Sequence, residues 1–227
     1  MKSVDSKLIP TAVFDVCDTL YYSNTTHDFV RCVVEKMPIS PATVVYRLLN
    51  NRWSPLRYLF VALGVATGWD GLKKYNVSVL TGMKSEEIAA HATCFVEQFL
   101  DQRKIIQTHD LIEKFKKDGL RVVLCSSSID PIVAAVARDL GIEDFVGTSL
   151  KFEGDTFTGA ISNETTGRKL AILNTKDLIG SLEYAASDNL SDLSLLVASK
   201  NAIAVTHRRK NEAFWKSRDF KIIDLDI

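Results

Sequence analysis

The stretch Ala12-Val13-Phe14-Asp15-Val16-Cys17-Asp18-Thr19-Leu20 reads as a short apolar strand that ends in an aspartate and a tight polar turn. Open α/β sheets bind ligands at the carboxyl ends of their strands, so a carboxylate at Asp15 is placed for chemistry rather than for packing. Aspartate and threonine also follow strands simply because they suit turns and helix caps. The segment alone leaves both interpretations open, and the rest of the chain decides between them.

Length and composition narrow the class of protein. The chain has 227 residues, of which 46% are hydrophobic and 25% charged, and this balance is typical of a folded, soluble protein. The length fits one domain with a sizeable insertion or two small domains. The 28 basic and 28 acidic side chains give a formal net charge of zero, so we expect neither a nucleic acid nor a membrane surface as partner.

The cysteines and the apolar segments bear on the cellular compartment. Cys17, Cys32, Cys94 and Cys125 show no metal-type spacing, which favours free thiols in a reducing cytoplasm. The start of the chain is polar and has no signal-peptide pattern, so we expect a cytoplasmic protein. The apolar run at residues 58–67 is shorter than the roughly 20 residues that span a membrane, and we expect a buried helix there.

Secondary-structure signals divide the chain in two. Residues 23–108 contain helical stretches broken by prolines and glycines, and almost no strand pattern. From Thr108 onwards, strands and helices alternate, which predicts βαβ units and a parallel sheet with helices on both faces. We therefore predict an α/β fold: a Rossmann-like three-layer core with a parallel sheet (residues 1–22 and 109–227) and a helical cap (23–108) inserted after the first strand. The later elements are expected as helices at 109–118, about 130–140, 168–179, 190–199 and 210–216, strands at 122–125, 182–187, 202–205 and 220–224, and a hairpin within 144–162.

Four groups of residues carry the chemistry. Asp15 can attack phosphorus and form an acyl phosphate. Ser126-Ser127-Ser128 follows the second strand, where hydroxyl and backbone NH groups can hold phosphate; a plain serine-rich turn is the alternative. Lys169 at a helix start works against the helix dipole, and its presence is more natural if it pairs with Asp15 and a phosphoryl group; a solvated surface lysine is the alternative. Asp188 and Asp192 flank a strand-to-helix turn and could both face Mg²⁺, whereas a helix cap explains one acid but not both.

These groups, in this order, resemble the haloacid dehalogenase superfamily of phosphohydrolases, and the C-terminal half resembles its phosphoserine phosphatase branch. The stretches similar to that branch are VVLCSSSIDPIVAA (122–135), Leu140-Gly141-Ile142, Phe157-Thr158-Gly159 and Ser187-Asp188-Asn189-Leu190-Ser191-Asp192-Leu193. In the last of them, Ser187 stands where the branch usually has glycine. The insertion after the first strand matches the C1-type cap of the family.

The resemblance implies a role for each group. Asp15 would be the nucleophile, and Lys169 would steady both the nucleophile and the phosphate. Ser126, with Ser127, would bind phosphate, and Thr19 would order the first loop beside the substrate. Mg²⁺ would be held by Asp188, Asp15 and the backbone carbonyl of Cys17, with Asp192 supporting the metal site or binding through water. The implied function is Mg²⁺-dependent hydrolysis of a small phosphorylated metabolite through an aspartyl-phosphate intermediate.

The first motif departs from the family pattern at Cys17, where the family has an aspartate that protonates the leaving group and activates water. Such acid–base help contributes roughly 10²–10⁴-fold, and a thiol is a poor substitute. Asp18 could take over this role with altered geometry, the substrate could need little acid help, or the protein could have become a non-catalytic phosphate-ligand binding or scaffold protein. A dehalogenase also lacks the second aspartate, but it would leave Asp188 and Asp192 unexplained.

The cap is expected to set specificity by closing over the site. Candidate contacts are the loop at residues 21–27, including His27, and the basic residues Arg47, Arg52 and Arg57, which could clamp a second anionic group. Solvated surface charge is the simpler interpretation of the arginines. For His27, the simpler interpretation is a surface histidine near Thr26, which would cap the start of a helix. Trp53, Phe60 and Trp69 are expected in the core of the cap. The sequence specifies neither the substrate nor the oligomeric state.

Overall fold

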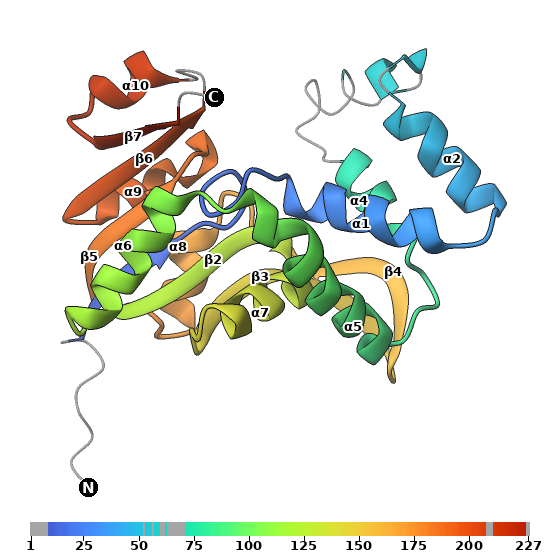
Figure 1. The fold of residues 1–227 in the computed structure, drawn as a ribbon, viewed down its shortest axis with the longest axis horizontal. Helices are drawn as coiled ribbons and strands as arrows, with labels where there is room; N and C mark the ends of the chain where they lie inside the picture. The colour runs from blue at the N-terminus through green and yellow to red at the C-terminus, as the bar shows by residue number, and fades with distance from the viewer. Residues whose placement is uncertain are drawn as a thin grey trace, which may run out of the picture.

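The computed structural model describes residues 9–51, 53–55, 57–59, 62, 71–207 and 211–225. The described strands form one seven-stranded sheet in the order β4-β3-β2-β1-β5-β6-β7 (Figure 1). All neighbouring strands pair in parallel except β3 and β4, which form an antiparallel hairpin. The strands are β1 (Pro10–Phe14), β2 (Arg121–Ile129), β3 (Asp144–Glu153), β4 (Thr156–Asn163), β5 (Ser181–Ser187), β6 (Asn201–His207) and β7 (Lys221–Leu225). The predicted α/β fold is confirmed.

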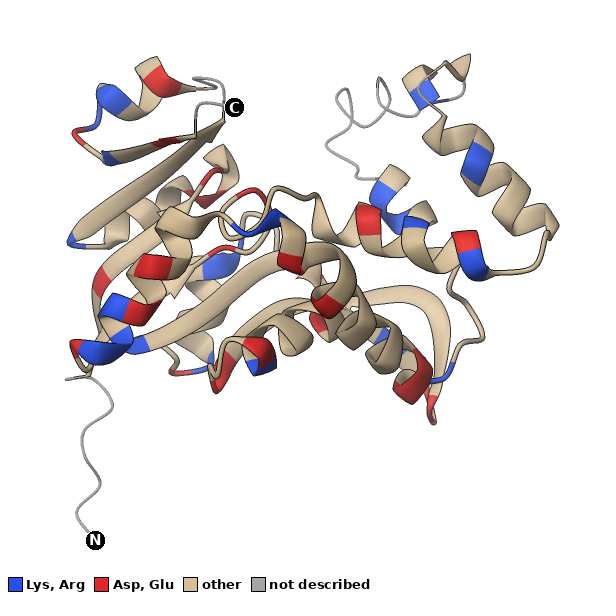
Figure 2. Ribbon diagram, viewed as in Figure 1, with Lys and Arg blue, Asp and Glu red and all other residues tan. Residues whose placement is uncertain are grey.

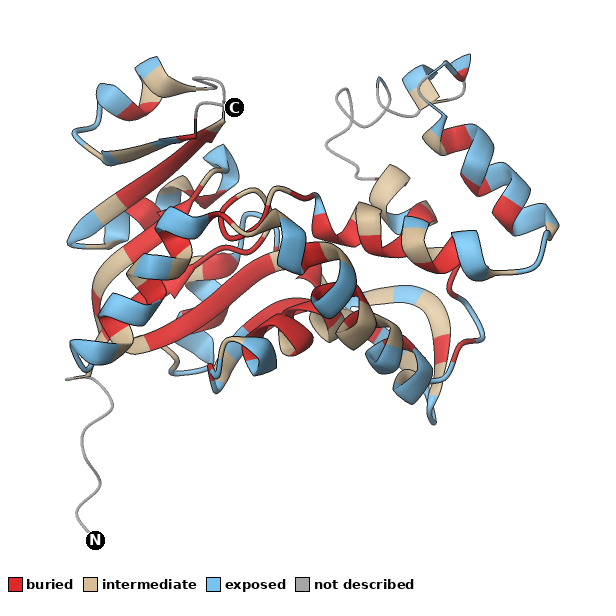
Figure 3. Ribbon diagram, viewed as in Figure 1, coloured by how far each residue is buried: buried red, intermediate tan, exposed pale blue. Residues whose placement is uncertain are grey.

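Helices cover both faces of the sheet because successive side chains of a strand point to opposite faces. In β1, Ala12 and Phe14 join one hydrophobic cluster with α5, α6 and α7, whereas Val13 joins a second cluster with α8, α9 and α10. Figure 3 shows the strands between these layers as largely buried. The helices are α1 (Thr25–Lys36), α2 (Pro41–Asn50), α4 (Gly71–Ser78), α5 (Ser85–Phe95), α6 (Ile106–Lys117), α7 (Asp130–Asp139), α8 (Lys169–Thr175), α9 (Leu193–Ala198) and α10 (Glu212–Lys216).

Most of the expected elements are present, and several differ in their bounds. Strand β2 continues to Ile129 instead of ending at residue 125, because Ile129 pairs again with Thr148 of β3 after a bulge. Helix α8 ends at Thr175 and not near 179, since Asp177 adopts a left-handed conformation (φ 53°) that a helix cannot continue through. The helix expected at 190–199 begins with a 3₁₀ turn at Leu190–Asp192.

The helices α1, α2 and α4 lie together at one end of the molecule, on the right of Figure 1. The segment after α4 is tied to the β3–β4 hairpin: Gly82 N donates to Phe157 O (2.9 Å), and Phe157 N donates to Met83 O (2.9 Å). Helix α5, which lies within the predicted cap, contacts α7 of the predicted core. The division into a core and a cap stays a prediction. The hydrogen bonds of Gly82 and Met83 with Phe157 attach the segment after α4 to the β3–β4 hairpin.

Two side-chain predictions for the helical segment are wrong. Trp53 was expected in the core of the cap but is 78% exposed, because it lies in the turn after α2 and not on the buried face of a helix. Tyr58 and Leu59, expected in a buried helix, are 63% and 55% exposed. Phe60, Trp69 and Arg52 lie outside the described residues.

Charge and hydropathy agree with the composition. Basic and acidic residues are interspersed over the helices in Figure 2 and form no continuous stripe of one sign. Within the described ranges, no helix is long and apolar enough to cross a membrane.

Candidate active site

The carboxyl ends of β1, β2 and β5 bring the predicted residues to one edge of the sheet. Phe14 of β1 pairs with Leu124 of β2 and with Ala186 of β5. Asp15, the next residue, therefore lies between the ends of the two neighbouring strands, and its backbone NH donates to the carbonyl of Ala186 (3.0 Å). This is the edge at which parallel sheets bind their ligands.

Lys169, the first residue of α8, lies between two buried carboxylates. Its Nζ atom is 3.0 Å from Oδ1 of Asp15 and 2.6 Å from Oδ2 of Asp192, and all three side chains are at most 3% exposed. Burial alone would lower the pKa of Lys169, but the charges of Asp15 and Asp192 outweigh burial and hold this pKa above its usual value. Burial, opposed by the charge of Lys169, raises the pKa of Asp15, and Asp192 adds to the rise. One ammonium therefore compensates only one of two buried carboxylates.

Asp192 lies behind Lys169 and is absent from the wall of the cavity described below. Its Oδ2 atom also accepts a hydrogen bond from the hydroxyl of Ser187 (2.6 Å). Ser187 is the residue that replaces the usual glycine, and its hydroxyl further accepts from Asn189 N (3.1 Å). Asp192 therefore contacts Lys169 and Ser187 and does not face the cavity.

Thr19 joins the first loop to the loop after β5. Its hydroxyl accepts from the backbone NH of Asp188 (3.1 Å) and lies 3.4 Å from Asp188 Oδ1, while its carbonyl accepts from Thr108 (2.8 Å). Thr19 is fully buried and does not line the cavity. Its contacts position Asp188 rather than a substrate.

The three serines occupy a bulge in β2. Between the pairs Cys125–Val146 and Ile129–Thr148, β2 has two more residues than β3, so Ser126-Ser127-Ser128 leaves the ladder. The bulge is possible because Gly147 has no side chain: a Cβ atom there would lie 2.6 Å from Asp130 Cα. Ser127 and Ser128 line the cavity. Ser126 is buried beside Asp15, and its hydroxyl accepts from the backbone NH of Ser128 (3.2 Å).

A cavity of about 340 Å³ opens between this edge of the sheet and the helices α1 and α4. Its wall at the sheet side includes Asp15, Asp18 and Asp188. The other described lining residues are Cys17, Asn24, Thr26, His27, Leu72, Lys73, Asn76, Ser127, Ser128, Thr166 and Asn189. Arg47 and Arg57 do not line it: Arg47 is exposed, and Arg57 donates to the carbonyl of Asn50 (3.5 Å).

Cys17 and Asp18 occupy different environments. The Sγ atom of Cys17 lies 2.9 Å from the hydroxyl of Thr25 and 3.0 Å from that of Ser128. Burial, reinforced by the nearby charge of Asp15, raises the pKa of this thiol. Asp18 has a left-handed backbone (φ 45°), and its carbonyl oxygen lies 2.5 Å from Nε2 of His207.

The donor set fits a magnesium ion. Asp15 and Asp188 present carboxylates to one cavity next to the backbone of Cys17, and Mg²⁺ prefers oxygen ligands. The excess of buried negative charge around Lys169 also favours a bound cation. Within the described residues, no three His, Cys, Asp or Glu side chains gather as a metal cage. This agrees with the habit of Mg²⁺ to use one or two carboxylates together with waters and substrate phosphate.

Several residues of the site have no clear signal in the sequence. Lys73 of α4 donates to Ser127 O (2.8 Å) and to Glu164 (2.8 Å), which joins α4 to the core. It stands in the ordinary pair Lys73-Lys74. Asn24, and not Thr26, is the N-cap of α1, and the hydroxyl of Thr26 instead accepts from Ile129 N (3.2 Å).

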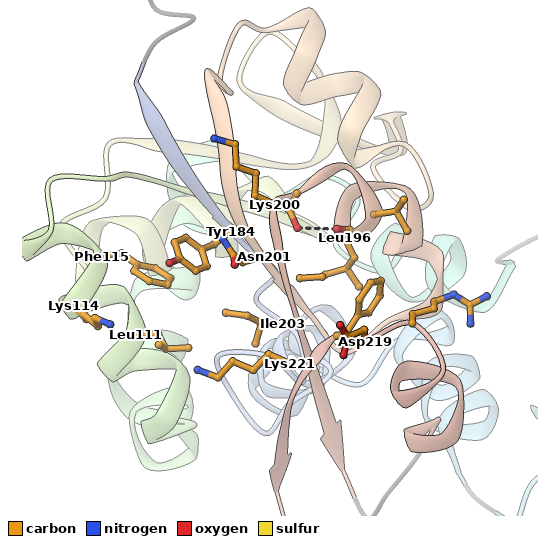
Figure 4. A pocket seen from close by; sticks show the side chains of 15 residues that line it. Leu111, Lys114, Phe115, Tyr184, Leu196, Lys200, Asn201, Ile203, Asp219 and Lys221 are labelled. Atoms are coloured by element: carbon orange, nitrogen blue, oxygen red, sulfur yellow. Dashed lines mark hydrogen bonds between the residues drawn. The ribbon is translucent and has the colours of Figure 1, made fainter.

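A larger cavity, of about 660 Å³, lies at the amino ends of β6 and β7. Figure 4 shows it between Phe115 and Tyr184 on one side and the segment with Asp219 and Lys221 on the other. None of the candidate catalytic residues lines it. We therefore place the chemistry in the smaller cavity.

The comparisons with known proteins agree with this geometry. A family model of haloacid dehalogenase-like hydrolases matches residues 12–196, and the chain belongs to this family. A search of curated protein sequences gives no significant match.

Solved structures are similar at low sequence identity. A Bordetella pertussis Tohama I protein of unknown function has a TM-score of 0.74 and 16% identity, with 96% of this chain and 100% of that chain covered. A phosphoserine phosphohydrolase-like protein from Francisella tularensis subsp. tularensis SCHU S4 has a TM-score of 0.63 and 15% identity, covering 95% of both chains. A phosphoserine phosphatase described as a phospho-aspartyl intermediate analogue has a TM-score of 0.58 and 15% identity, covering 94% and 93%. The predicted likeness to the phosphoserine phosphatase branch is confirmed at the level of the fold.

Proposed function

We propose that the protein is a Mg²⁺-dependent phosphatase that hydrolyses a small phosphomonoester through an aspartyl phosphate on Asp15. The observation that carries the proposal is the placement of Asp15: it is buried beside Lys169 and faces a cavity that it shares with Asp188. A bound Mg²⁺ ion would be held by Asp15, Asp188 and the Cys17 carbonyl, and it would offset the charge of the transferred phosphoryl group.

The chain's own residues perform two steps. In the first, Asp15 attacks phosphorus, the bond from phosphorus to the substrate oxygen breaks, and the leaving oxygen takes a proton from Asp18. In the second, water attacks the phosphorus of the aspartyl phosphate and gives a proton to Asp18. The bond to Asp15 breaks, and inorganic phosphate leaves.

Asp18 takes this role because Cys17 is unsuited to it. The thiol has a raised pKa and is held between two hydroxyls, so it stays protonated and is a weak acid at neutral pH. Asp18 is half-buried and lines the cavity, which leaves a carboxylate within the space where the leaving group and water must lie.

The remaining residues orient these groups. Lys169 steadies Asp15 and the phosphoryl oxygens, and Asp192 positions Lys169 through the 2.6 Å contact. The backbone of the Ser126–Ser128 bulge and the hydroxyl of Ser127 hold phosphate, since NH groups between a strand and a helix start favour anions. The segment at 23–108 acts as a cap that excludes water.

Phosphate release from a panel of phosphomonoesters, with Mg²⁺ and with chelator, tests the proposal. The blank is Asp15→Asn. Metal-dependent release that the variant lacks is expected. Equal release from the wild-type protein and the variant would refute the proposal. No release from a folded protein that still binds Mg²⁺ would favour a protein that binds a phosphate ligand without hydrolysing it. The replacement of the acid–base aspartate by Cys17 would then explain the lack of turnover.

A further inference from the structure

The wall of the cavity opposite the sheet is formed by polar side chains of α1 and α4. Asn76 of α4 is 3% exposed and is fixed by Asn50, whose Nδ2 donates to Asn76 Oδ1 (2.8 Å). The same Asn50 lies 3.1 Å from Nε2 of His27. Asn24, at the start of α1, completes this face of the cavity. Hydrogen bonds through Asn50 join the Asn76 amide and the His27 imidazole.

The neighbouring wall adds groups of the same kind. It includes Thr166, whose hydroxyl donates to Glu164 Oε1 (2.9 Å), and Asn189, whose amide oxygen accepts from Ser191 N (3.0 Å). Hydroxyls and carboxamides both donate and accept hydrogen bonds. Their natural counterpart is a ligand whose own groups do both, which is a property of alcohols. A carboxylate only accepts, so it cannot donate to the oxygen atoms of these side chains.

Lys73 is the one lysine or arginine among the described lining residues, and its charge is already engaged. Its Nζ atom contacts Glu164 Oε1 at 2.8 Å, Ser127 O at 2.8 Å and Thr148 Oγ1 at 3.4 Å. Burial would raise the pKa of Glu164, but the hydrogen bond and charge of Lys73, with Thr166, lower it to about 2. Glu164 is therefore ionised at neutral pH and neutralises Lys73.

The other charges near the cavity disfavour a second anionic group on the substrate. Asp18 also lines the cavity and supplies no positive charge for a second anionic group. Among the described residues, Arg47 and Arg57 are absent from the wall.

We propose that the substrate is the phosphate ester of a small, uncharged polyhydroxy compound, a polyol or sugar phosphate, and that esters bearing a carboxylate are rejected. This inference rests on the proposed phosphatase function and adds its substrate class. The cavity volume of about 340 Å³ lies at the small end of ligand sites, so the substrate fills most of it.

Matched substrate pairs test the proposal. Glycerol 3-phosphate and 3-phosphoglycerate share a carbon skeleton and differ by a hydroxymethyl group against a carboxylate, as do sorbitol 6-phosphate and 6-phosphogluconate. We expect kcat/KM for the uncharged member of at least one pair to exceed that of its partner by about tenfold or more. Equal values, or a preference for the carboxylates in both pairs, would overturn the proposal while leaving a phosphatase.

Two variants test whether the pairing of Lys73 with Glu164 causes the preference for uncharged substrates over carboxylates. Glu164→Gln keeps the shape of the side chain but releases the charge of Lys73, so we expect the ratio of the two kcat/KM values to fall by about tenfold, mainly through KM for the carboxylate. Lys73→Met removes the charge altogether and should not improve the carboxylate substrate. Equal ratios in wild type and Glu164→Gln would contradict this account of Lys73.

Equilibrium binding keeps the inference separate from turnover. In Asp15→Asn with Mg²⁺, calorimetric titration with the same pairs reports recognition alone. Tighter binding of an uncharged member by about tenfold supports the proposal even if no phosphate is released from any compound. Tighter binding of the carboxylates, or no binding of any of the four, overturns it.

Discussion

The thiol of Cys17 lies 3.0 Å from the hydroxyl of Ser128, and the hydroxyl of Thr25 lies on its other side at 2.9 Å. The contact between Cys17 and Ser128 joins the first loop to the bulge in β2, two segments that are more than a hundred residues apart in the sequence. Because the pKa of the Cys17 thiol is raised by burial and by Asp15, the thiol stays protonated at neutral pH. We therefore propose Asp18 as the group that transfers protons.

Asp18→Asn should slow turnover without abolishing substrate binding. Loss of an acid–base group costs about 100-fold or more in kcat, whereas KM should change little. The loss should be larger for an alkyl phosphate than for p-nitrophenyl phosphate, because nitrophenolate leaves without protonation. Steady-state kinetics on both substrates measure this difference. Unchanged kcat for the alkyl phosphate would remove Asp18 from the mechanism.

Cys17→Asp should restore activity to the Asp18→Asn variant. The hydroxyls of Thr25 and Ser128 can both donate to a carboxylate at position 17, so the new side chain fits the existing contacts. We expect a recovery of about tenfold or more in kcat. Cys17→Asn in the same background is the matched control and should give none. A double variant no faster than Asp18→Asn alone would show that position 17 does not reach the reacting atoms.

Asp15→Asn should stabilise the protein in metal-free buffer. The folded-state pKa of Asp15 is raised, so its contribution to stability is present below the unfolded pKa and is lost as pH rises through the folded value. At neutral pH the ionised carboxylate is therefore a cost, and the variant leaves Lys169 and Asp192 as a balanced pair. A gain of about 1 kcal/mol would raise the unfolding midpoint by about 2–4 °C.

Mg²⁺ should reverse this order. The ion binds the wild-type carboxylates and raises the midpoint of the wild-type protein by mass action, while the variant responds less. Thermal unfolding with Mg²⁺ and with chelator measures both effects. A metal-free variant less stable than the wild type would contradict the charge balance described for Lys169.

The contact between Lys73 and Glu164 predicts that the stability of the folded protein depends on pH in the acidic range. The pKa of Glu164 is lowered to about 2, so its stabilising contribution is present above the unfolded pKa near 4.5 and is lost as pH falls towards 2. Glu164→Gln should be less stable than the wild type by about 1 kcal/mol at pH 7, after screening at this half-exposed site. The difference should vanish near pH 2. A difference that persists in strong acid would assign it to packing and not to charge.

Residues in strands and at strand ends were predictable from the sequence. The apolar run before Asp15 and the alternation after Thr108 follow from the periodicity of buried strands, and they place Asp15, the serines and Asp188 at one edge of the sheet. The roles at that edge were harder to separate. Lys169 and Asp192 are buried behind the cavity, which depends on how α8 packs and not on a local pattern.

The cap face of the site was the least predictable part. Lys73 and Glu164 lie 91 residues apart and meet only because the segment after α4 pairs with the β3–β4 hairpin. The bulge in β2 was also missed, since it depends on the close approach of Gly147 to Asp130. The exposed position of Trp53 shows that an aromatic residue between helices does not by itself mark a core.

The most direct test of the account is to trap the phosphorylated protein and find the modified residue. The wild-type protein is mixed with Mg²⁺ and a substrate that it hydrolyses, quenched in acid and reduced with borohydride, and the peptides are analysed by mass spectrometry. The account predicts an acyl phosphate at Asp15, detected as its reduced product, and none in Asp15→Asn. Turnover without any modification at Asp15, or a phosphoryl group carried by Asp18 or Asp188 instead, would contradict it.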